Sequence, residues 1–94
     1  MKETTVKFIK LKEKHKATNK VQHFSDGNQI VDFKELRIVT YENDPGYLII
    51  YFDSRGQEVS DTYHESLQQA LDYARWEFNI EPLEWEDIHI EKKY

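Results

Sequence analysis

The stretch that decides the fold runs from residue 47 to residue 79 and reads YLIIYFDSRGQEVSDTYHESLQQALDYARWEFN. It opens with residues 47–53, a run in which side chains of both parities are apolar, as in a strand that is covered on both faces. The segment Ser54 to Gln57 is rich in turn-forming residues, and residues 58–63 predict the next strand. The stretch therefore predicts two neighbouring strands of an antiparallel sheet, followed by a helix.

The helix begins at a capping box, in which the Ser66 hydroxyl can accept the amide proton of Gln69 and the Gln69 side chain can reach back. Asn79 can adopt the left-handed conformation that ends a helix, and Pro82 prevents its continuation. We expect an apolar stripe of this helix to pack onto the strand at residues 47–53. The stripe consists of Leu67, Ala70, Leu71, Ala74 and Phe78.

Turn and strand signals extend the sheet toward the N-terminus. Asp26-Gly27 stands between two short β-prone runs, and an Asp-Gly pair is a strong signal for a two-residue hairpin turn. Ile30, Phe33 and Leu36 also fit the spacing of a short helix, so this alternative stays open. The Lys-rich residues 13–20 have no apolar periodicity and are expected to form a solvated loop. Further strands are expected at residues 4–12, 21–25, 29–34, 36–42 and 85–90.

These elements predict a single α+β domain over residues 1–94, with one antiparallel sheet of about five to six strands and one amphipathic helix packed on one face. The core of the sheet is a meander with residues 47–53 as its central strand. In the first strand we expect Val6 and Phe8 on one face. A single helix leaves the other face of the sheet uncovered. Either the N-terminal segment folds across it, which we favour, or two chains pair there as a homodimer.

Charge is distributed unevenly along the 94 residues, which carry a formal net charge of −5. Residues 1–20 contain seven lysines and two glutamates, whereas residues 21–94 contain six basic and sixteen acidic residues. An acidic body repels a phosphate backbone, so nucleic acid is not expected as a partner. The sequence has no cysteine and no apolar run of signal-peptide or membrane-span length. We therefore expect a cytoplasmic protein that does not bind membranes.

Residues with catalytic or ligating side chains form no known motif. The four histidines, at positions 15, 23, 64 and 89, include no closely spaced pair of the kind that signals a zinc site. The three glycines fall in predicted turns rather than in a phosphate-binding loop. Asp61 and His64 could pair as carboxylate and imidazole, although the simpler interpretation has them bind amides of the turn and the helix start. We expect no catalytic residue, no metal site and no cofactor.

Trp76 is the residue least well explained as part of the core. Helical geometry places it roughly 180° from Leu67, opposite the apolar stripe. Exposed Trp and Tyr are enriched in binding hot spots, and acids nearby would give a polar rim. The alternative is that the C-terminal strand or the N-terminal arm covers Trp76. Trp85, in contrast, is expected in the core beside Phe78. The candidate partner-binding residues are Tyr73, Trp76, Asp72 and Glu77.

The C-terminal half contains an acidic D-T-[WY]-H corner, a helix of the pattern A-x-x-x-A-x-x-E-[FY] and a late Trp. The residues of this pattern are Asp61, Thr62, Tyr63, His64, Ala70, Ala74, Glu77, Phe78 and Trp85. With the preceding meander, the pattern resembles the C-terminal half of small bacterial proteins of uncharacterised function. The resemblance covers about residues 36–90 and implies the fold more than an activity. In size and acidity the chain is also similar to immunity proteins that block secreted toxins.

Two functions of different classes are compatible with these features. The first is a non-enzymatic, acidic protein-binding module, an immunity-type or regulatory partner of a basic protein. It rests on the acidic body, on Trp76 and on the missing catalytic motifs. The second is a small enzyme or ligand-binding domain with a cleft near Asp61 and His64. A deep pocket that converges on His64 would favour the second function, and a flat acidic face would favour the first.

Overall fold

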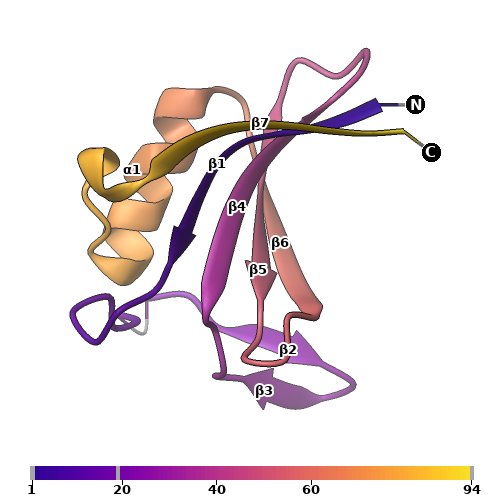
Figure 1. Cartoon of the computed structure of the whole chain (residues 1–94). Helices are drawn as coiled ribbons and strands as arrows, with labels where there is room; N and C mark the ends of the chain where they lie inside the picture. Colours follow the sequence, from indigo (N-terminus) through magenta and orange to yellow (C-terminus); the bar gives the residue numbers. More distant parts are fainter. Residues whose placement is uncertain (1, 19, 94) are drawn as a thin grey trace.

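The computed structural model describes residues 2–18 and 20–93. In this part of the chain, Figure 1 shows a curved main sheet, a helix packed against it and a small separate hairpin. The predicted fold class, α+β with an antiparallel meander and one helix on the sheet, is confirmed. The elements are β1 (Lys2–Lys10), β2 (His23–Ser25), β3 (Asn28–Ile30), β4 (Glu35–Tyr41), β5 (Tyr47–Phe52), β6 (Glu58–His64), α1 (Leu67–Phe78), the 3-10 helix η1 (Pro82–Glu84) and β7 (Glu86–Lys93).

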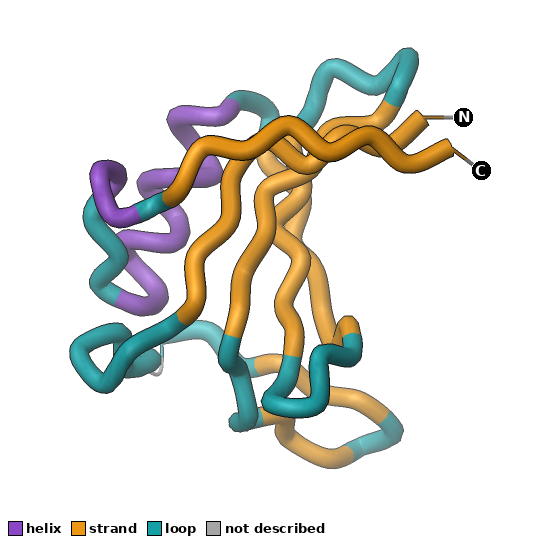
Figure 2. The backbone as a smooth tube through the Cα atoms, in the orientation of Figure 1, coloured by secondary structure: helices purple, strands orange, loops and turns teal. Residues whose placement is uncertain are grey.

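The main sheet has five strands in the order β6-β5-β4-β1-β7, and every neighbouring pair is antiparallel. β4, β5 and β6 form the predicted meander. β1 lies between β4 and β7, so the two ends of the chain lie side by side in Figures 1 and 2. The middle strand is therefore β4. The prediction that residues 47–53 form the central strand was wrong, because β1 and β7 both extend the sheet beyond β4.

A bulge in β1 decides which of its side chains face the helix. Opposite β4 the register shifts between Thr5 and Lys7, so Val6 is an extra residue and the alternation of faces restarts after it. Val6 packs against the core under the helix, whereas Phe8 lines a hollow on the opposite face of the sheet. The expectation that Val6 and Phe8 share a face was wrong for this reason.

The core lies between the sheet and α1. Leu71 and Trp85 belong to it, as predicted. The rings of Phe33, Tyr51 and Phe78 meet in edge-on or tilted pairs, with centroids 5.5 to 6.2 Å apart. Removal of these apolar surfaces from water is the main stabilisation of the fold. The buried members are Ile9, Leu36, Ile38, Ile49, Tyr51, Ala70, Leu71, Ala74, Phe78, Ile80 and Trp85.

Both ends of α1 follow the local signals in the sequence. The Ser66 hydroxyl accepts a hydrogen bond from the Gln69 amide at 3.1 Å, and the Gln69 side chain accepts one from the Glu65 amide at 3.1 Å. Asn79 adopts the left-handed conformation, with φ of 60°, and donates its amide to the Arg75 carbonyl. These contacts satisfy backbone groups that a helix end leaves unpaired. Among the described residues, no helix has the length and apolar composition needed to cross a membrane.

The hairpin of β2 and β3 turns at Asp26 and Gly27, whose φ angles of 52° and 81° are those of a type I′ turn. It is shorter than predicted, because pairing is confined to residues 23–25 and 28–30, and it forms its own two-stranded sheet. Residues 31–34 are neither helix nor strand, and Leu36 belongs to β4. The alternative of a short helix in this segment is therefore excluded.

The face of the sheet away from α1 is not covered by the N-terminal segment. That expectation was wrong, because residues 2–10 are part of the sheet as β1. A hollow of about 180 Å³ on this face is lined by side chains from all five strands, which shows how far the sheet curls. Val39 and Ile50 line it and are 1% and 4% exposed. The Arg37 guanidinium lies 4.3 Å from the centroid of the Phe52 ring, so a polar side chain of the sheet covers part of its own apolar surface.

Candidate functional site

Three of the predicted partner-binding residues lie on the outer surface of α1. Asp72, Tyr73 and Trp76 line a shallow hollow of about 360 Å³ together with His64 and Gln69. Helical spacing explains most of this set, because residues three or four apart share a face of a helix. Trp76 is 43% exposed, so neither the C-terminal strand nor the N-terminal arm encloses it. We call these five residues the aromatic helix surface.

Three rings form a row across the aromatic helix surface. The centroids of His64 and Tyr73 are 4.7 Å apart and those of Tyr73 and Trp76 are 5.4 Å apart, and both pairs are tilted. Tilted pairs are favourable because the edge of one ring approaches the π-face of the other. His64 is the last residue of β6, and α1 begins shortly after it. The row therefore rests on a strand and a helix rather than on a loop.

Glu77 was expected on the polar rim of this surface, and that prediction was wrong because its side chain is buried, with 2% exposure. One residue is a step of about 100° around a helix, so Glu77 turns toward the core while Trp76 turns outward. Position 77 also falls three residues after Ala74 and seven after Ala70, within the apolar stripe. That spacing is the sequence signal that could have placed Glu77 inside.

Glu77 is the centre of a buried polar cluster. Its Oε1 accepts a hydrogen bond from the Tyr51 hydroxyl at 2.6 Å, and its Oε2 lies 2.8 Å from Nε2 of His23. Nδ1 of His23 lies 2.6 Å from the Ser60 hydroxyl. The carboxylate can only accept, so Nε2 of His23 carries a proton and donates it to Glu77, whereas the Ser60 hydroxyl can either donate to Nδ1 or accept from it. Both oxygens of the buried carboxylate thus have partners, which offsets the cost of removing it from water.

The cluster continues from the core to the aromatic helix surface. The Tyr51 hydroxyl lies 3.5 Å from the Thr62 hydroxyl, which lies 2.8 Å from Nε2 of His64. Thr62 and His64 face the same way because alternate residues of a strand share a face. Burial, with the Glu77 carboxylate acting in the same direction, raises the pKa of Tyr51, and burial lowers the pKa of His64. Both groups are therefore neutral near pH 7. We call this set of residues the buried polar chain: Glu77, Tyr51, His23, Ser60, Thr62 and His64.

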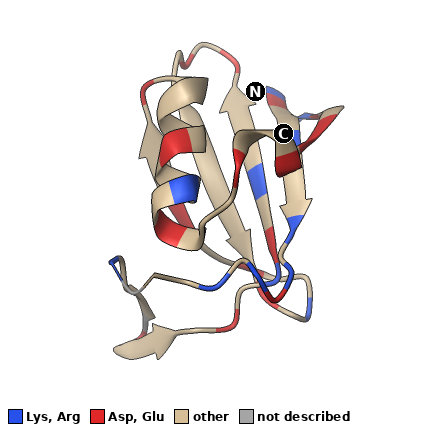
Figure 3. Cartoon of the chain, turned by 90° about the vertical axis from the view of Figure 1, so that its left-hand side faces the viewer, with Lys and Arg blue, Asp and Glu red and all other residues tan. Residues whose placement is uncertain are grey.

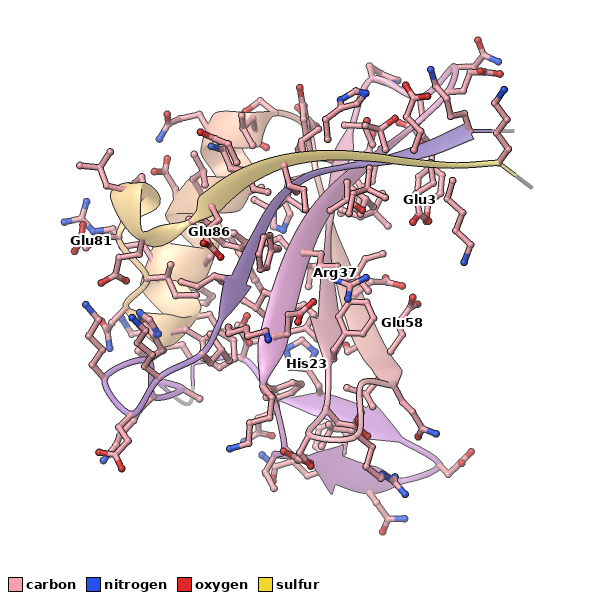
Figure 4. All side chains as sticks on the ribbon, in the orientation of Figure 1. Glu3, His23, Arg37, Glu58, Glu81 and Glu86 are labelled. Carbon is pink, nitrogen blue, oxygen red and sulfur yellow. The ribbon has the colours of Figure 1, made fainter. Side chains whose placement is uncertain are left out.

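His23 is the member of the buried polar chain that could not be predicted from the sequence. It is 7% exposed, and its ring centroid lies 5.1 Å from that of Phe33 and 4.6 Å from that of Tyr51. Figure 4 labels His23 where the hairpin meets the main sheet. Its contact with Glu77 joins residues 54 positions apart. No spacing rule connects a histidine in a short hairpin with a glutamate on a distant helix.

Asp61 and His64 do not form the carboxylate–imidazole pair that a cleft between them would use. Asp61 pairs with Ile50 in the register of β5 and β6, whereas His64 pairs with Tyr47. Their separation of three places the two side chains on opposite faces of β6. Nε2 of His64 contacts the Thr62 hydroxyl instead of a backbone amide. The hollow beside His64 is shallow and open to solvent.

The basic N-terminal segment partly neutralises the acidic C-terminal segment beside it. Hydrogen bonds from Lys14 and His15 lower the pKa of the Glu84 carboxyl to about 2. Figure 3, which views the molecule from the side of α1, shows acidic and basic residues together on this side. Part of the negative charge expected from the sequence is thus neutralised by lysines of the same chain. Ion pairs between lysines of the first segment and acids of the second include Lys2–Glu91, Lys7–Asp87 and Lys14–Glu84.

No three His, Asp or Glu side chains within residues 2–18 and 20–93 lie close enough together to hold a metal ion. Comparison of the chain with protein-family models, with curated proteins and with solved structures found no match. The groups that the fold brings together are the aromatic helix surface and, directly behind it, the buried polar chain.

Proposed function

We propose that the protein is a non-enzymatic protein-binding module whose contact surface is the aromatic helix surface. The observation that carries the proposal is the exposure of Trp76, the largest side chain of α1, which is 43% exposed although the fold has an apolar core. Tryptophan and tyrosine are enriched in binding hot spots, because each buries a large area at a small cost in conformational entropy. Burial of Trp76 and Tyr73 against a partner would remove apolar surface from water that the isolated chain leaves exposed.

The surface is also held in one arrangement before any partner arrives. The row of His64, Tyr73 and Trp76 is supported by ring contacts along its length. Behind it, hydrogen bonds connect His64 through Thr62 and Tyr51 to the last turn of the helix. Binding to a surface of this kind requires little ordering of side chains, and that favours affinity.

The partner that we propose is a basic protein. The chain carries a formal net charge of −5, and Asp72 lies within the aromatic helix surface. Opposite charge accelerates the encounter of two proteins and disfavours acidic competitors. An immunity-type or regulatory role, in keeping with the small size and acidity that the chain shares with immunity proteins, is a setting in which a small acidic module binds such a target.

The experiment that tests this proposal measures which proteins of the native cell the immobilised full chain retains, with identification by mass spectrometry. The variants are Trp76→Ala and, as a matched control, Leu83→Ala, because Leu83 is an apolar side chain that is 99% exposed on η1. A hot-spot residue contributes about 2 kcal/mol or more, so Trp76→Ala should lose the partner and Leu83→Ala should keep it. Equal retention by Trp76→Ala and the parent chain would overturn the proposal.

A further inference from the structure

Lys20 lies over the ring of Trp76. Its Nζ is 5.7 Å from the centroid of the indole, within the range of a cation–π interaction. Thr18, two residues earlier, is hydrogen-bonded to the end of α1. Its amide donates to the Glu77 carbonyl at 2.8 Å, and its hydroxyl donates to the Trp76 carbonyl at 3.0 Å. The contacts of Thr18 therefore bring the ammonium group of Lys20 to the aromatic helix surface.

The chemistry around this ammonium group indicates what the surface can bind. Asp72 lies one helical turn before Trp76 and lines the same hollow as Tyr73. The Asp72 carboxylate, whose Oδ1 accepts a hydrogen bond from the Gln68 side chain at 2.9 Å, thus lines one hollow with two aromatic rings. Both kinds of group attract a cation, the carboxylate by its charge and the rings by their quadrupole. One of the rings, the indole of Trp76, already has a cation of the chain itself over it. Lys20 is exposed, so its interaction with the indole is screened by water and weak.

We infer that the aromatic helix surface receives a cationic side chain, an arginine or a lysine, from a basic partner, and that Lys20 is an internal competitor displaced on binding. The inference rests on the proposed function, because it names the partner chemistry of the same surface. Arginine suits the site better than lysine. Its planar guanidinium can stack on the indole of Trp76 while it donates two hydrogen bonds to the carboxylate of Asp72.

The probe for this inference is a fluorescein-labelled hexa-arginine peptide, whose binding to the full chain is measured by fluorescence anisotropy. Lys20→Ala is compared with Lys16→Ala, which removes the same charge from the same loop and also alters an exposed side chain. Lys20→Ala should bind the peptide about two- to fivefold more tightly than Lys16→Ala, the factor expected when a weak cation–π contact no longer competes. Trp76→Ala should weaken peptide binding and abolish the difference between the two lysine variants. Asp72→Asn should weaken it as well.

Equal affinities of Lys20→Ala and Lys16→Ala would overturn the inference, since the change in net charge would then account for the whole effect. A difference between them that persists in the Trp76→Ala background would also overturn it. The partner-retention experiment separates the two proposals. If Trp76→Ala loses the native partner while the two lysine variants bind the peptide alike, protein binding at this surface stands and the cation site does not. If Trp76→Ala keeps the native partner, the proposed function fails, and with it the assignment of a protein as the source of the cation.

Discussion

Trp76 and Glu77 are neighbours in the chain and lie on opposite sides of α1. The tryptophan faces the solvent and the glutamate faces the core, which is the reverse of what these side chains usually prefer. The indole is 43% exposed and the carboxylate 2%. The inner face is explained by stability, because Glu77 joins the helix to β5 and to the hairpin through Tyr51 and His23. Packing in the core does not explain why the outer face carries an exposed tryptophan. The contrast shows that a residue whose position the fold does not require is the better candidate for a function.

The largest effect on this contrast is expected from Glu77→Ala. The variant leaves the Tyr51 hydroxyl and the His23 imidazole without their acceptor in the core, and each buried polar group left unsatisfied costs about 1–3 kcal/mol. Glu77→Gln keeps an acceptor for Tyr51 and should cost less. Urea denaturation measures the free energy of unfolding of both variants. A loss below about 1 kcal/mol for Glu77→Ala would show that the inner face does not depend on the carboxylate.

The apolar part of the inner face is tested by Leu71→Ala. Leu71 is 8% exposed and belongs to the core under the helix, so the substitution should cost about 2–5 kcal/mol of stability. Leu67→Ala, at a partly buried position of the first turn, should cost less and serves as the control. Thermal unfolding followed by circular dichroism gives the comparison. An unchanged melting temperature for Leu71→Ala would mean that α1 packs with another face.

His64 connects the two faces, and its protonation should affect stability at mildly acidic pH. Burial lowers the pKa of His64 from its ordinary value of 6.5. As the pH falls, His64 is therefore protonated in the unfolded chain before it is protonated in the folded chain. The stability due to neutral His64 is complete above about pH 6.5 and is lost as the pH falls toward the folded-state pKa.

Stability measured from about pH 7 to pH 5 should decline less in His64→Gln than in the parent chain. His89→Gln, at a side chain that is 71% exposed, is the control and should follow the parent. An identical decline in His64→Gln would assign the effect to another group.

The smallest effect on folding is expected from Trp76→Ala. Substitution on the outer face should change the free energy of unfolding by about 0.5–1 kcal/mol at most, as at other surface positions. Urea denaturation checks this in the same buffer as the peptide titration. A variant that unfolds would assign Trp76 to the support of the fold and would remove it as a candidate for binding.

Features set by contacts a few residues apart were predicted well. The cap at Ser66, the terminator at Asn79 and the type I′ turn at Asp26 and Gly27 depend on groups within about four residues of one another. The order of the strands was predicted less well. A strand pattern shows which residues are apolar but does not identify the neighbouring strand, and a bulge such as that at Val6 reverses the faces without a sign in the pattern.

For the candidate site, the sequence alone was enough to establish that Trp76 lies opposite the apolar stripe of α1, with Tyr73 on the flank of that surface, because helix geometry converts spacing into direction. Tertiary structure decided the rest. The burial of Glu77, the insertion of His23 and the placement of Lys20 over the indole all depend on contacts between distant segments. So does the pairing of Lys2 with Glu91, which are 89 positions apart. The free energy of such a contact belongs to two groups that meet once the chain has folded, and neither group carries it in its local sequence.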